Sequence, residues 1–171
     1  MYEPVNALSY ASAFAEALPG GVLLNTKLGD KFNSMVIGWG HVGVLWGLPT
    51  VTVYVRESRY TKELLNHTGV FTVSVPFGAP APANIMRVCG SRSGRDVDKA
   101  ALFTLGEPQQ NGVPGVKELP LTFECRVLYR QAQSPADIAP QVLSRFYARG
   151  TDAHDFHTAY VGEIVSAYIL K

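Results

Sequence analysis

Residues 32–55 read FNSMVIGWGHVGVLWGLPTVTVYV and contain no Asp, Glu, Lys or Arg. The length of this stretch alone would suit a membrane-spanning segment. Turn-forming residues interrupt it, at Gly38, Gly40, Gly43, Gly47 and Pro49. The run Thr50–Val55 is β-branched or aromatic throughout, which is typical of a strand. We therefore expect two buried strands joined by a Gly-rich turn, and no membrane span.

Further β-like runs lie on both sides of this stretch, and the helical patterns are few and short. The expected strands are Gly21–Thr26, Phe32–Gly40, Val44–Trp46, Thr50–Arg56, Val70–Val75, Leu121–Gln131 and Tyr160–Leu170. The expected helices are Asn6–Leu18, Ser58–His67 with Ser58 as N-cap, Ala83–Val88 and Ile138–Ala148. Because helices do not separate successive strands regularly, the pattern predicts a mainly β barrel or sandwich with short peripheral helices.

The composition is that of an ordinary globular protein. The 171 residues include 47% hydrophobic and 17% charged ones, enough for a single domain over residues 1–171. The net charge of +1 gives no reason to expect a nucleic-acid partner. Glu3 and Glu16 in the first segment argue against a secretory signal, so a cytoplasmic location is expected.

The two cysteines, Cys89 and Cys125, are far apart in the sequence and form no Cys-x-x-Cys motif. Buried reduced thiols are the favoured interpretation, and a disulfide or a redox-active thiol is the alternative.

The segment from Gly38 to Gly43 matches the G-x-G-x-x-G pattern of dinucleotide-binding folds. That pattern requires a helix immediately after it, to bind the pyrophosphate. Only Val44–Leu48 precede Pro49, and Gly47 lies among them, so no useful helix can start. We expect these glycines to serve turns and barrel corners.

A basic cluster is predicted where a strand ends and a helix begins, at Arg56, Ser58, Arg59 and Thr61. Free backbone N–H groups at a helix start attract anions, and guanidinium and hydroxyl groups add donors. Cations alone are disfavoured at that end of a helix. The cluster therefore indicates a phosphate site, and the alternative is a capped helix with a solvated basic first turn.

Two other polar segments are less specific. The glycines of Cys89–Lys99 permit close approach to a ligand, although a solvated loop with internal ion pairs explains the segment equally well. His154 and His157, flanked by Asp152 and Asp155, are a minimal ligand set without a third firm ligand, so no metal site is expected. No catalytic nucleophile or paired-carboxylate signature is recognisable, which assigns any chemistry to a bound cofactor.

Several motifs in series resemble the flavin reductase-like, FMN-binding split-barrel family, and its flavoredoxin-type branch in particular. They are NSMVIGWG at 33–40, VRESRYT at 55–61, FTVSVP at 71–76, CG at 89–90, SGRDVDK at 93–99, ECRV at 124–127 and HTAYVGEI at 157–164.

The resemblance implies a Greek-key split β-barrel that forms a homodimer with FMN near the subunit interface. By position, Arg56, Ser58, Arg59 and Thr61 would hold the FMN phosphate. Asn33, Ser34 and Met35 would line the edge of the isoalloxazine ring. Ser91, Ser93 and Arg95 would lie close to the flavin or to the partner subunit. Trp39 and Trp46 are either flavin neighbours or buried packing residues.

The function implied is that of an FMN-dependent oxidoreductase, in which NADH or NADPH delivers hydride to flavin N5 without a protein acid or base. The alternative is a flavoredoxin-like electron carrier with permanently bound FMN, no nicotinamide site and a redox partner protein. A barrel that binds another phosphorylated ligand without catalysis is the third hypothesis.

Overall fold

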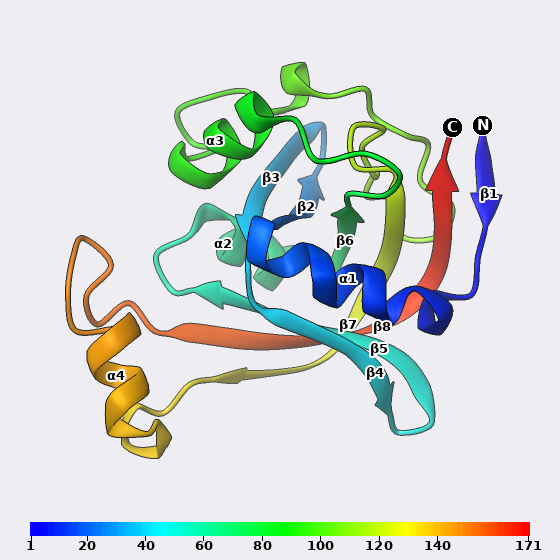
Figure 1. Cartoon of the computed structure of the whole chain (residues 1–171). Helices are drawn as coiled ribbons and strands as arrows, with labels where there is room; N and C mark the ends of the chain where they lie inside the picture. The colour runs from blue at the N-terminus through cyan, green and yellow to red at the C-terminus, as the bar shows by residue number, and fades with distance from the viewer.

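A computed structural model describes all 171 residues, which fold around one antiparallel eight-stranded sheet (Figure 1). The strands are β1 (Tyr2–Pro4), β2 (Val22–Leu28), β3 (Lys31–Ile37), β4 (Gly40–Leu45), β5 (Leu48–Arg56), β6 (Val70–Val75), β7 (Leu121–Ala132) and β8 (His157–Leu170). Their order is β3-β2-β6-β7-β8-β5-β4, and β1 pairs with β8. The β2–β3 and β4–β5 hairpins thus stand at the two ends of the β6–β7–β8 meander. The prediction of a mainly β split barrel is confirmed.

The segment 32–55 forms three strands, as the β-like runs Phe32–Gly40, Val44–Trp46 and Thr50–Arg56 indicated, and not two strands joined by a Gly-rich turn. β4 turns into β5 through Trp46 and Gly47, whose φ angles of 54° and 74° are both left-handed, as in the tight turns that join two-residue hairpins. A Cβ on Gly40 would lie 2.7 Å from the carbonyl oxygen of Thr52, so glycine allows β4 to pair closely with β5. Gly38 lies in the connection between β3 and β4, whereas Gly40 and Gly43 lie within β4 and not in the turn that was expected; no helix follows the pattern.

The helices are short and lie around the sheet. They are α1 (Ala11–Ala17), α2 (Tyr60–Thr68), α3 (Ala83–Ser91) and α4 (Pro140–Phe146), with 3-10 turns on both sides of α1. Figure 1 shows α1 lying across the barrel and α4 at the far end of the long β7–β8 pair. No helix has the length and apolar character that crossing a membrane requires.

The start of α2 corrects one prediction. Arg59, not Ser58, is the N-cap residue, and no side chain caps the helix. The Ser58 hydroxyl donates instead to the Asp155 carboxylate, across a large gap in the sequence. The helix ends at Gly69, whose φ of 66° is left-handed.

Two buried apolar clusters hold the fold together. The larger fills the barrel and includes Phe14 of α1, Phe71 of β6 and Phe123 of β7, all fully buried. The smaller packs α3 against β2 and β3 and contains Cys89. Cys89 and Cys125 are buried and form no disulfide with each other, which agrees with the favoured interpretation and excludes the disulfide between them.

Candidate functional site

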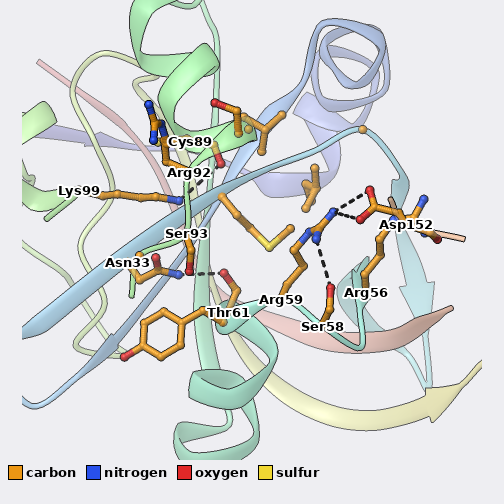
Figure 2. A pocket seen from close by; sticks show the side chains of 18 of the residues that line it. Asn33, Arg56, Ser58, Arg59, Thr61, Cys89, Arg92, Ser93, Lys99 and Asp152 are labelled. Carbon is orange, nitrogen blue, oxygen red and sulfur yellow. Dashed lines mark hydrogen bonds and ion pairs between the residues drawn. The ribbon is translucent and has the colours of Figure 1, made fainter. Parts of the chain in front are cut away.

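A cavity of about 590 Å³ opens between β3, the end of β5, the start of α2, and α3 with the segment that follows it (Figure 2). Its volume lies within the range of small-molecule sites. Nine of the ten residues predicted to form the site line it: Asn33, Met35, Arg56, Ser58, Arg59, Thr61, Ser91, Ser93 and Arg95. The motifs at 33–40, 55–61 and 93–99, which are far apart in the sequence, thus come together around one cavity, as the resemblance implied.

Ser34 is the exception. Side chains alternate between the two faces of a strand, so Asn33 and Met35 face the cavity and Ser34 does not. Its side chain is fully buried and its hydroxyl oxygen has no hydrogen-bond partner. What Ser34 offers is its carbonyl oxygen, which accepts a hydrogen bond from Lys99 Nζ at 2.6 Å.

The basic cluster lies at one end of the cavity, where the β5 residue Arg56 pairs with His157 of β8. Arg56 Nη1 donates to the carbonyl oxygens of Asp155, at 2.6 Å, and Asp152, at 3.2 Å. Arg59 Nη1 donates to the Ser58 hydroxyl at 3.1 Å. Two guanidinium groups and a hydroxyl thus gather at one point of the wall.

Two carboxylates from the loop before β8 fill the position predicted for a phosphate. Arg59 Nη2 contacts both carboxylate oxygens of Asp152 at 3.0 Å (Figure 2). The backbone N–H and the hydroxyl of Ser58 donate to the Asp155 carboxylate at 3.1 and 2.5 Å. The N–H and O–H donors of Ser58 and Arg59 are therefore arranged for an anion with several oxygen atoms. In this structure they donate to the carboxylates of Asp152 and Asp155.

The middle of the cavity is held by a side-chain amide. Asn33 Nδ2 donates to the Thr61 hydroxyl at 2.8 Å, which joins β3 to α2. The Asn33 Oδ1 atom is buried and has no hydrogen-bond partner. A Cβ on Gly94 would clash with this oxygen, so glycine permits the close approach of the loop.

The segment after α3 is only partly engaged with the cavity. The Ser91 hydroxyl donates to the Arg87 carbonyl, and the Ser93 hydroxyl accepts from the Arg95 N–H. The Arg95 guanidinium pairs with Glu63 at 2.7 Å, and both side chains are about half exposed. Glu63 belongs to α2, so this ion pair joins the segment to the helix and is not the ion pairing within the loop that the alternative interpretation expected.

Lys99 also lines the cavity, although sequence reasoning assigned it to a polar surface loop. The residue is 2% exposed. Its neighbour Cys89 is a protonated thiol, because burial raises the Cys89 pKa. No charge pattern in the sequence distinguishes Lys99 from the solvated residues around it.

An aromatic wall borders the basic end. Trp39 packs on His157 with ring centroids 4.6 Å apart, and His157 Nδ1 shares a hydrogen bond of 2.8 Å with the Tyr147 hydroxyl. Trp39 lines the cavity, as one of its two interpretations expected. Buried packing is wrong for Trp46, which lies at the β4–β5 turn, is 62% exposed and does not line this cavity.

No three His, Cys, Asp or Glu residues are grouped to hold a metal ion. Asp152 and Asp155 are instead bonded to the basic cluster, and His157 is bonded to Tyr147.

Comparison with known proteins identifies the family. The sequence model of the flavin reductase like domain matches residues 15–171, so the chain belongs to this family. Among curated proteins, it is 32% identical over 143 residues to the uncharacterized protein YddH of Escherichia coli (strain K12). The match covers 81% of this chain and 62% of YddH, so the chain spans less than two thirds of the length of that relative.

Solved structures share the fold. A flavoredoxin from Methanosarcina acetivorans has a TM-score of 0.67 and 28% identity, over 88% of this chain and 68% of that one. The NADH:FAD oxidoreductase SgcE6 of Streptomyces globisporus, in complex with NAD and FAD fragments, has a TM-score of 0.63 and 17% identity, over 88% of this chain and 74% of that one.

His157 makes the stability of the protein sensitive to acid. Burial, helped by the charge of Arg56, lowers its pKa from 6.5 to about 4. In the unfolded chain the ring takes up a proton near pH 6.5, so between these values the unfolded state binds more protons and stability falls as the pH falls. Between pH 6.5 and pH 5 we expect wild type to lose about 2 kcal/mol more than His157→Gln.

Urea unfolding of both proteins at the two pH values measures this difference. Equal losses in wild type and His157→Gln would show that another group is responsible.

Proposed function

We propose that residues 1–171 form one unit that binds FMN in this cavity and acts as an oxidoreductase, with NADH or NADPH as the electron donor. The observation that supports this most strongly is the cluster of Arg56, Ser58 and Arg59, with anionic oxygens already seated on it. Flavin binding is a property of the family, and the binding residues are our assignment.

The phosphate of FMN fits the donor set better than a carboxylate does. The Arg59–Asp152 pair is weak, since the two side chains are 39% and 40% exposed and pairs of this kind contribute about 0–1 kcal/mol. A phosphate offers more charge and three oxygens to the same donors. Its binding would displace the Asp152 and Asp155 carboxylates, and Thr61 would hold the adjoining wall through Asn33.

The flavin ring would lie toward Asn33, Met35 and Trp39, with Ser91, Ser93 and Arg95 on the side of α3. Asn33 Oδ1 has no hydrogen-bond partner but is buried against Gly94, so a ring N–H would reach this acceptor only if the loop at Gly94 moved. The Ser34 side chain has no part in this assignment. Bound FMN supplies the atom that accepts hydride, so the protein needs to orient the two rings and needs no acid or base.

Two relatives point to different uses of the flavin. The Streptomyces structure contains NAD and FAD fragments, and its name describes an NADH:FAD oxidoreductase. The Methanosarcina relative is named a flavoredoxin, which supports the second candidate, an electron carrier with a redox partner protein. We place both candidates in the cytoplasm, where the free thiols of Cys89 and Cys125 would persist.

We also propose a homodimer. The β4–β5 turn carries a group of exposed apolar side chains that includes Val44 and Trp46, each 62% exposed. Trp46 lies beside Tyr129 of β7, which is 46% exposed, at a ring distance of 6.4 Å. Contiguous exposed apolar surface is typical of an interface, and a second copy of the chain would cover it.

Arg56→Ala and Arg59→Ala each remove a charged donor from the phosphate position. We expect each to weaken FMN binding at least tenfold, or about 1.5–3 kcal/mol, and to leave binding of riboflavin, which lacks the phosphate, nearly unchanged. Fluorescence titration with the two flavins measures both affinities. Arg126→Ala is the matched control, because Arg126 pairs with Glu163 outside the cavity. Equal weakening of both flavins would remove the phosphate assignment.

Anaerobic mixing of the FMN-loaded protein with NADH or NADPH distinguishes the two candidate functions. If the protein is a reductase, we expect the absorbance of the bound flavin to bleach within seconds. If the flavin stays oxidised with both nucleotides but is reduced by dithionite, the carrier is the better description.

Trp46→Asp places a charge in the apolar surface of the β4–β5 turn. We expect wild type to sediment as a dimer and Trp46→Asp as a monomer at the same micromolar concentration. Leu28→Asp, at an exposed apolar position in the other hairpin, is expected to remain dimeric. A monomeric wild type with flavin bound contradicts the proposed dimer.

A further inference from the structure

Lys99 is a buried cation with no acidic partner. It is 2% exposed, whereas no other Lys or Arg in the chain is buried. Its ammonium forms no ion pair, although five ion pairs occur elsewhere. The adjacent carboxylate of Asp98 is used to accept the Ala100 N–H at 3.0 Å. Burying a charge without a counter-ion is costly, so this arrangement needs an explanation.

The neighbours of the ammonium only partly compensate for its charge. Lys99 Nζ donates to the carbonyl oxygens of Ser34, at 2.6 Å, and Cys89, at 3.5 Å. These contacts fix the ammonium between β3 and α3 and use two of its three protons. Burial lowers the pKa of Lys99 and so works against its charged form. Cys89, the titratable group that acts on Lys99, supplies no negative charge, because burial raises the pKa of its thiol. An anion that enters the cavity beside Lys99 would favour the ammonium.

The position of Lys99 separates it from the basic cluster. Figure 2 shows Lys99 on the opposite side of the pocket from Arg56, Arg59 and Asp152. The basic cluster is balanced by the carboxylates of Asp152 and Asp155, while the Lys99 side has no such group among its bonded partners. A ligand with a phosphate at one end and a second, conditional negative charge at the other would match both sides.

A flavin has such a conditional charge. Transfer of a hydride adds two electrons and one proton to the neutral ring, which then carries one negative charge unless it takes a second proton from solvent. We propose that Lys99 is the counter-ion for this charge and makes the cavity bind reduced FMN more tightly than oxidised FMN. This inference rests on the proposed function, and it assigns Lys99 a role that the sequence motifs did not.

The affinities of Lys99→Met for oxidised and reduced FMN test the inference, with both titrations done anaerobically. We expect affinity for reduced FMN to fall at least tenfold more than affinity for oxidised FMN. A tenfold difference equals a midpoint potential about 30 mV more negative. Lys99→Arg should retain most of the preference, and Lys171→Met, which removes an exposed lysine paired with Glu3, should leave it unchanged.

Equal weakening of both forms would show that Lys99 only joins β3 to α3, and would overturn the inference while the proposed function stands. A wild-type protein that binds no FMN would overturn the proposed function itself, and the inference with it.

A measurement on wild type covers the case in which Lys99→Met does not fold. The potential of a two-electron couple falls about 30 mV per pH unit when one proton is taken up, and twice that for two protons. The slope of the potential against pH therefore changes at the pH where uptake switches from two protons to one. We expect this change of slope at a lower pH for bound FMN than for free FMN. The same pH for both would contradict a counter-ion near the ring.

Discussion

The pairing of Arg56 with His157, where β5 ends and β8 begins, determines where the charges of the cavity lie. It brings the first residues of α2 against the loop before β8, although about a hundred residues separate them. Because β5 is paired with β8 as far as Arg56, the ladder fixes the backbone from which this guanidinium extends. The position of the anion site therefore depends on the register of β5 against β8, and so does the position of the cavity wall beside it.

The cavity balances its positive charges in two different ways. At one end, the Asp152 carboxylate pairs with Arg59 and the Asp155 carboxylate accepts from Ser58, and such partly exposed contacts exchange readily for a better anion. At the other end, the buried ammonium of Lys99 is hydrogen-bonded only to carbonyl oxygens, so its charge would act on a bound ligand. The two ends therefore have different roles. We assign phosphate binding to Arg56 and Arg59, and stabilisation of the charge on the flavin ring to Lys99.

The sequence was sufficient for the strands and for most of the cavity lining, because β-branched runs and the 55–61 motif are local signals. It could not indicate β1, which pairs with β8 only through the meeting of the chain ends. It also failed for Lys99 and Asp152, since burial and ion pairing depend on segments far away in the chain. Ser34 does not line the cavity although its motif does, because a resemblance assigns a motif as a whole and does not show which of its side chains are buried.

A crystal structure of the protein with FMN tests the central claim most directly. We predict the phosphate on Arg56, Ser58 and Arg59, with the carboxylates of Asp152 and Asp155 displaced and the ring on the side of Lys99. A phosphate bound elsewhere, with both carboxylates still on the basic cluster, would contradict it.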